Sequence, residues 1–87
     1  MSAEILIIDD NADIRSILKD LINDAGFKTR VAANYSQALA EIDKKLPDVA
    51  ILDVKLDKGD NDGIELLSHI KKKNKDVPVI IISGHAN

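Results

Sequence analysis

The sequence predicts an α/β protein in which a parallel sheet carries helices on both faces. Short apolar runs alternate with segments whose apolar residues recur at helical spacing. The apolar runs are nearly continuous, as in strands that are buried on both faces. The resulting order, in which each strand is followed by a helix and then another strand, is typical of right-handed crossovers between parallel strands.

Length and composition narrow the class further. With 87 residues the chain is expected to form one domain, residues 1–87, because chains usually divide only beyond about 250 residues. A hydrophobic fraction of 45% argues against a disordered tail, and the lack of cysteine excludes a disulfide scaffold and a thiolate zinc site. A net charge of −3 and only two aromatic residues argue against nucleic-acid binding. No signal peptide and no apolar run near the ~20 residues of a membrane span are found, so we expect a cytoplasmic protein without membrane contact.

The first strand is predicted at Glu4–Ile8, and it ends abruptly at Asp9 and Asp10. Asn11 is a good N-cap for the helix that follows, and Gly26 suits the left-handed residue that closes it. The apolar residues between them form one stripe of an amphipathic helix. This stripe comprises Ile14, Ile17, Leu18, Leu21 and Ile22.

The second strand is predicted at Phe27–Ala33, whose alternation is imperfect and fits a half-exposed strand. Either Asn34 or Ser36 can cap the second helix, and Pro47 ends it. The residues expected to face the core on this helix are Ala38, Leu39, Ile42 and Leu46.

The third strand, Val49–Leu52, ends at Asp53 and leads into a polar loop. Asp62–Gly63 opens a third helix, and Val77–Ile82 is the fourth strand, with Ser83–Gly84 directly after it. The residues expected on the inner face of the third helix are Ile64, Leu67 and Ile70.

Acidic and hydroxyl side chains follow three of the four predicted strands. In a parallel sheet, ligands bind beyond the carboxyl ends of the strands, so Asp10 and Asp53 converge if the first and third strands pair. Converging carboxylates repel until a proton or a cation neutralises them. All-oxygen ligation favours Mg²⁺ over Zn²⁺. For any one aspartate a turn or capping role is an alternative, but three acids and Ser83 at one edge favour a site.

Other chemistries find less support. No glycine-rich loop follows the first strand, which argues against a P-loop nucleotidase or a dinucleotide-binding protein. Lysines near the end of the third helix suit its solvated, C-terminal face. A metal-dependent hydrolase would need a general acid or base near Asp53, and neither His69 nor His85 is a convincing one.

Together these segments resemble the receiver domain of two-component response regulators. The resemblance covers the whole chain and lies in Ile5–Asp10, Val49–Asp53, Asp62–Gly63 and Val79–Gly84. The long loop before Gly63 and the segment Ile82–His85 are similar to the NtrX branch of NtrC-type regulators. The resemblance implies a flavodoxin-like, CheY-like sheet with strand order 2-1-3-4.

The resemblance also implies roles for the acidic residues. Asp53 matches the phosphoacceptor, which takes a phosphoryl group from a histidine kinase. Asp9 and Asp10 match the acidic pair that holds Mg²⁺ together with Asp53, and the backbone carbonyl of Lys55 matches a further protein ligand. Such a domain is a signalling phosphoacceptor rather than an enzyme, with at most Mg²⁺-dependent self-phosphorylation and self-dephosphorylation.

Two further matches concern the switch that responds to phosphorylation. Ser83 matches the hydroxyl that binds the phosphoryl group, and Gly84 matches the small residue after it. No residue in the chain matches the family's phosphoryl-pairing lysine. The implied output is transcription regulation through output domains of the parent protein, without nucleic-acid contact by this domain.

Compared with the family, the chain lacks the last helix, strand and helix, so we expect it to be incomplete at its C-terminus. The fourth strand would then be an apolar edge, and the first helix would stand alone on its face of the sheet. We therefore expect self-association through the exposed fourth strand or through the uncovered apolar face. The alternative function is a receiver-shaped protein-interaction module that is not phosphorylated in this truncated form.

Overall fold

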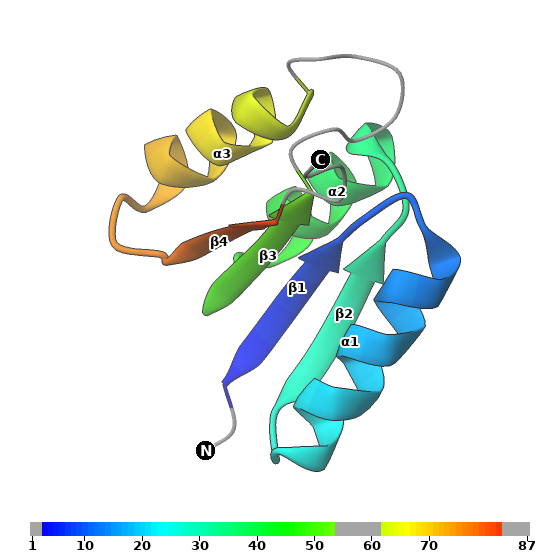
Figure 1. Ribbon diagram of the computed structural model, residues 1–87. Helices are drawn as coiled ribbons and strands as arrows, with labels where there is room; N and C mark the ends of the chain where they lie inside the picture. Colours follow the sequence, from blue (N-terminus) through cyan, green and yellow to red (C-terminus); the bar gives the residue numbers. More distant parts are fainter. Residues whose placement is uncertain (1–2, 54–61, 83–87) are drawn as a thin grey trace.

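The computed structural model describes residues 3–53 and 62–82, and within these ranges strands and helices alternate as the sequence predicts (Figure 1). No helix in the described ranges combines the length and the apolar character needed to cross a membrane. The elements are β1 (Glu4–Ile8), α1 (Ala12–Asp24), β2 (Lys28–Ala32), α2 (Tyr35–Lys44), β3 (Val49–Asp53), α3 (Asp62–Lys73) and β4 (Val79–Ile82).

The strands form one parallel sheet in the order β2-β1-β3-β4, which confirms the predicted class and strand order. In the register of the sheet, Ile7 of β1 lies between Val31 of β2 and Ile51 of β3. Since every described strand runs in the same direction, their carboxyl ends share one edge of the sheet. The predicted acidic residues follow the strands at this edge.

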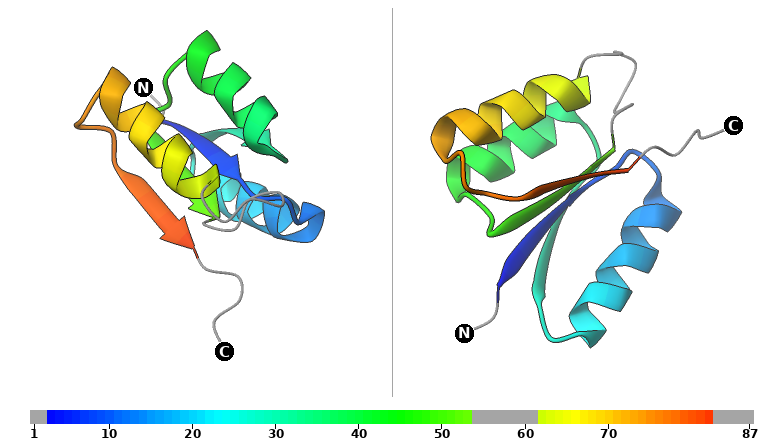
Figure 2. Two further views of the ribbon diagram at one scale, coloured as in Figure 1. Left: turned by 90° about the horizontal axis from the view of Figure 1, so that it is seen from above. Right: turned by 60° about the vertical axis from the view of Figure 1, so that its left-hand side comes forward.

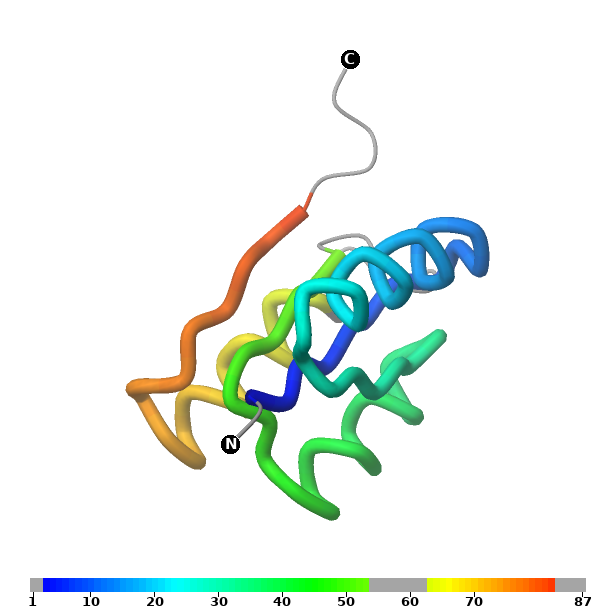
Figure 3. Tube along the Cα trace, turned by 90° about the horizontal axis from the view of Figure 1, so that it is seen from below, coloured from blue at the N-terminus to red at the C-terminus, as the bar shows by residue number. Residues whose placement is uncertain are grey.

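Two helices, α2 and α3, cover one face of the sheet, and the course of the chain between the layers can be followed in Figures 2 and 3. The main core lies under these helices. Side chains from β1 and β3 meet those of both helices there, and burial of this apolar surface is the main stabilising contribution. The buried members are Leu6, Ile8, Ala32, Ala38, Ile42, Ala50, Leu52, Leu66, Ile70 and Val77.

The opposite face is covered by α1, which packs on β1 and β2 (Figure 2). Leu18 and Ile22 of this helix pack against a small cluster of buried isoleucines from β1 and β3. The rest of the predicted stripe is not buried. Ile17 is 55% exposed and Leu21 is 61% exposed, because in the described part of the chain no second helix lies beside α1 on this face.

The inner face of α3 differs from the prediction at its first position. Ile64 is 54% exposed, whereas Leu66 and Ile70 are fully buried and Leu67 packs against them. The predicted stripe and the observed one share Leu67 and Ile70, so helical spacing alone could not choose between Ile64 and Leu66. The expected inward position of Ile64 is therefore wrong.

Two predicted strands are shorter in the structure. Gly26 has a positive φ of 98° and ends the turn after α1, and the exposed Phe27 precedes β2 rather than belonging to it. At the fourth strand, Val77 is buried but lies before β4. Pro78 has no N–H to donate, and only its carbonyl joins the ladder, by accepting from the amide of Ala50 at 3.1 Å.

Asparagine side chains cap the N-termini of α1 and α2. Asn11 Oδ1 accepts from the backbone N–H groups of Asp13 at 2.9 Å and Ile14 at 3.2 Å, as predicted for the N-cap of α1. For α2, the N-cap is Asn34, whose Oδ1 accepts from the N–H of Gln37 at 2.8 Å. Of the two predicted candidates, Asn34 is thus the one that caps the helix.

The amino-terminal edge of the sheet is tied together by Arg30. Its guanidinium lies 3.1 Å from Glu4 Oε1 and 2.9 Å from Glu41 Oε1, and it donates to the carbonyl of Lys45 at 2.6 Å. These contacts join β2 to β1 and to the end of α2. A charged network therefore closes the edge opposite the predicted site.

Candidate functional site

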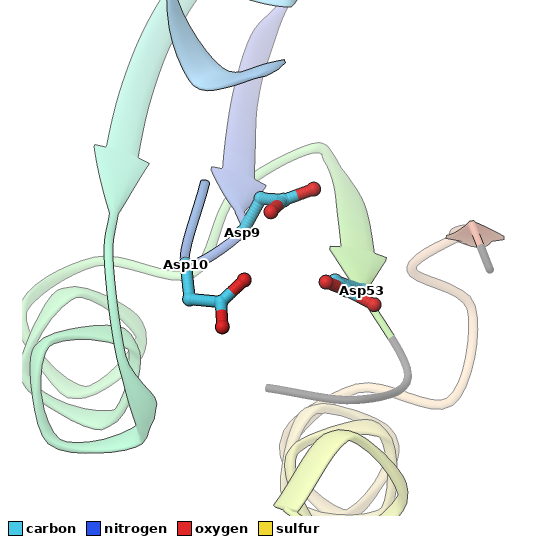
Figure 4. Close-up of side chains that lie close together, drawn as sticks. All are labelled: Asp9, Asp10 and Asp53. Atoms are coloured by element: carbon cyan, nitrogen blue, oxygen red, sulfur yellow. The ribbon is translucent and has the colours of Figure 1, made fainter. Parts of the chain in front are cut away.

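The three aspartates of the predicted site lie together at the carboxyl edge of the sheet (Figure 4). Asp9 directly follows β1, and Asp53 is the last residue of the neighbouring strand β3. The pairing of Ile8 with Leu52 brings these two strand ends level. One carboxylate oxygen from each of Asp9, Asp10 and Asp53 lies within 4.8 Å of the others, so the predicted convergence is confirmed.

Two of the three carboxylates are withdrawn from solvent. Asp9 is 4% exposed and Asp53 is 5% exposed, whereas Asp10 lies at the surface. Burying a carboxylate is unfavourable unless hydrogen bonds or a counter-charge offset the lost hydration. Asp9 Oδ1 accepts from the backbone N–H of Asn11 at 2.8 Å, which provides part of that compensation.

The electrostatics of the pocket favour neutralisation of its charge. Burial raises the pKa of Asp9 above its ordinary value, and the nearby charges of Asp53 and Asp10 raise this pKa further. The hydrogen bond from the Asn11 amide acts in the opposite direction. A bound cation would relieve the same repulsion that raises the pKa of Asp9.

The backbone around Asp9 is also fixed. Its N–H donates to the carbonyl of Ala32 in β2 at 3.1 Å, and its carbonyl accepts from Arg15 Nη1 in α1 at 2.8 Å. Sequence reasoning did not identify Arg15 as part of this region. The available signal was a basic residue in the first turns of a helix that begins at an acidic loop.

The donor set fits a magnesium ion. The acidic cluster consists of carboxylates alone, from Asp9, Asp10 and Asp53, and such hard oxygen ligands match Mg²⁺, which keeps several of its waters. The exposure of Asp10 leaves one side of the cluster open to water. The other predicted site residues, Lys55, Ser83 and Gly84, lie outside the described residues.

This chain is similar to known proteins over almost its whole length. The model of the response regulator receiver domain matches residues 5–87. Among curated relatives, the nitrogen assimilation regulatory protein NtrX of Azorhizobium caulinodans is 41% identical over 87 residues, which are 100% of this chain and 19% of that protein. Sporulation initiation phosphotransferase F of Bacillus subtilis is 39% identical over 85 residues, which are 98% of this chain and 67% of that protein.

Solved structures agree in fold. The crystal structure of NtrX from Brucella abortus superposes with a TM-score of 0.89 at 41% identity, over 100% of this chain and 20% of that one. A CheY-like receiver domain protein from Methanospirillum hungatei also gives a TM-score of 0.89, at 29% identity, over 100% of this chain and 68% of that one.

The chain thus spans about a fifth of the length of the NtrX proteins it matches. In this chain, the matched residues carry the parallel sheet and the acidic pocket. With a family match over nearly its whole length, this chain belongs to the response regulator receiver domain family.

Proposed function

We propose that this chain is a phosphoacceptor in two-component signalling, in which a histidine kinase donates a phosphoryl group to Asp53. The observation that carries the proposal is the convergence of Asp53 with Asp9 and Asp10 at the carboxyl edge of the sheet. The proposal further assigns the two neighbouring aspartates, Asp53 itself and the backbone carbonyl of Lys55 to Mg²⁺. When bound, the ion neutralises negative charge on the phosphoryl oxygens.

The proposed transfer uses Asp53 as a nucleophile. A carboxylate oxygen of Asp53 attacks phosphorus, the P–N bond to the donor histidine breaks, and the imidazole nitrogen keeps the electron pair of that bond. The product is an acyl phosphate on Asp53. Before transfer, Asp53 is 5% exposed, and such burial limits the access of water to a reactive group formed there.

The response to phosphorylation is assigned to the segment after β4. We propose that the hydroxyl of Ser83 moves to bind the phosphoryl oxygens. Gly84, a small residue next to it, leaves room for the movement of Ser83. We further propose transcription regulation as the output of a longer parent protein. The names of two relatives support a regulatory output, since one is a nitrogen assimilation regulatory protein and another a transcriptional regulatory protein. Contact with nucleic acid would belong to other domains of that protein.

The proposal is tested by labelling the chain with a small phosphodonor such as phosphoramidate in the presence of Mg²⁺. Intact-mass measurement should show the addition of one phosphoryl group, and this addition should be lost in Asp53→Asn and after chelation of the metal. The matched control is Asp24→Asn, which removes an exposed aspartate at the end of α1. Equal labelling of Asp53→Asn and the wild type would contradict the assignment.

A second candidate is a receiver-shaped interaction module that takes no phosphate, and the exposed isoleucines of β4 favour it. Ile80 is 52% exposed and Ile81 is 45% exposed on β4, which has no charged residue and lies at the edge of the sheet formed by the described residues. The other edge strand, β2, carries Lys28 and Arg30, and charges of this kind discourage edge pairing. The occupant we propose for the β4 edge is the same strand of a second copy.

Self-association is measured by sedimentation over a concentration series. The wild type should form a dimer as its concentration rises, and Ile80→Lys should remain monomeric because it places a charge on the β4 edge. Val31→Lys, at a residue of β2 that is 40% exposed, serves as the control and should dimerise like the wild type. A wild type that stays monomeric throughout would argue against this candidate.

A further inference from the structure

The turn between β1 and α1 is held at Asp9 by three hydrogen bonds of different origin. The N–H of Asp9 extends the β1–β2 ladder by donating to Ala32, and its carboxylate accepts from the nearby amide of Asn11. The third bond comes from α1, where Arg15 Nη1 donates to the carbonyl of Asp9 at 2.8 Å. Of these bonds, the one from Arg15 is made by a side chain of another element.

The carbonyl that Arg15 holds belongs to the peptide between Asp9 and Asp10. Because a peptide group is planar, the direction of this carbonyl fixes the direction in which the chain continues to the next Cα atom. Asp10 is exposed, so the surrounding core does not restrain it as it restrains Asp9. The Arg15 bond therefore acts on the more weakly held of the two neighbouring acids.

We propose that Arg15 is a positioning residue for the acidic pocket, which holds the Asp9–Asp10 peptide so that the Asp10 carboxylate points toward Asp9 and Asp53. This inference rests on the proposed function, since the pocket is taken to bind Mg²⁺. In this role Arg15 acts on the pocket without being a ligand of the proposed ion. Its effect on the pocket passes through the backbone of Asp9.

The charge of Arg15 and its positioning role predict opposite changes in Mg²⁺ affinity when the side chain is removed. A guanidinium near three carboxylates repels an incoming cation, so removing its charge alone would strengthen Mg²⁺ binding. Releasing the Asp9–Asp10 peptide would weaken binding, because the ligands would then have to be ordered by the ion. The sign of the change in affinity therefore separates the two roles.

The experiment is a Mg²⁺ titration of the ¹⁵N-labelled wild type and of Arg15→Met, followed by NMR. Arg15→Met keeps an apolar stem of similar length and should lower the affinity about tenfold, as loss of an outer-shell partner commonly does. Arg15→Lys keeps the charge and a donor and should recover part of the affinity. Lys19→Met, which removes an exposed positive charge one turn further along α1, should bind at least as tightly as the wild type. Unchanged or tighter binding by Arg15→Met would overturn the proposal.

A second measurement needs no metal. Hydrogen exchange of the Asn11 amide, which donates to the Asp9 carboxylate, should become faster in Arg15→Met and not in Lys19→Met. Exchange is compared with that of the Leu6 amide in β1, so that a loss of global stability is recognised. Should the wild type bind no Mg²⁺, the proposed function fails, while the exchange rate of Asn11 still decides the role of Arg15. Equal relative exchange in wild type and Arg15→Met would refute that role.

Discussion

The two faces of the sheet are built from the same strands yet are covered very differently. In β1, Leu6 and Ile8 face α2 and α3 while Ile7 faces α1, and all three are fully buried. The apolar residues of the helices on the two faces differ much more in burial than those of β1. Leu66 and Ile70 of α3 are fully buried, whereas Leu21 of α1 is 61% exposed. Apolar residues on a helix thus contribute to the core only as far as neighbouring elements enclose them.

The largest expected effect of this difference concerns stability. Ile70→Ala removes a fully buried side chain from the α2–α3 face and should lower the free energy of unfolding by about 2–5 kcal/mol. Leu21→Ala, on the α1 face, should lower it by less than about 1 kcal/mol because most of the side chain is already in water. Urea denaturation measures both values. Similar losses for the two variants would show that the faces do not differ in the way described.

A smaller effect is expected at the helix starts. Asn11→Ala leaves two N–H groups of α1 without their side-chain acceptor and should cost about 1 kcal/mol. Asn34→Ala is the matched variant on the other face, where the cap accepts from one N–H of α2, and it should cost less. Urea denaturation of both variants checks the order, and a larger loss for Asn34→Ala would reverse the comparison.

The smallest effect is the contribution of Asp43, on the well-covered face, to the pH dependence of stability. Asp43 of α2 lies 3.0 Å from His69 and 3.2 Å from Lys73 of α3. The hydrogen bond from His69, followed by that from Lys73, lowers the pKa of Asp43 from 3.8. The folded state therefore binds fewer protons, and the stabilisation is present above pH 3.8 and lost as the pH falls through the folded-state pKa.

Asp43→Asn should accordingly flatten the dependence of stability on pH below about 4, with a minor effect because the carboxylate is exposed. Thermal unfolding over a pH series measures the slope. The control is Asp20→Asn, an exposed aspartate on α1. An unchanged slope in Asp43→Asn would show that the contacts with α3 do not persist in solution.

Residue patterns predicted the four strands, though not all of their ends, and the resemblance to receiver domains supplied their order. Given that order, the meeting of the acids follows for a physical reason. Parallel strands end at one edge, so residues that follow them, such as Asp9 and Asp53, must be neighbours once β1 and β3 pair. N-caps such as Asn11 depend on local hydrogen bonds and could also be predicted from the sequence. The buried face of α3 could not be predicted, because Ile64 and Leu66 both fit the periodic pattern of that helix.

Contacts between side chains and distant backbone were also beyond sequence reasoning. The bond from Arg15 to the Asp9 carbonyl depends on the angle at which α1 leaves the loop. The network of Arg30 with Glu4 and Glu41 depends on the final packing of α2. Neither contact follows from residue spacing, since both need the completed arrangement of helices over the sheet.

The position of β1 in the middle of the sheet has a consequence for the order of assembly during translation. The first strand made by the ribosome can pair only with β2 until Val49–Asp53 has left the exit tunnel. Until then Asp9 and Asp10 have no third acid beside them, so the nascent chain carries no binding pocket. The pocket is therefore completed only when a single strand, β3, joins the sheet.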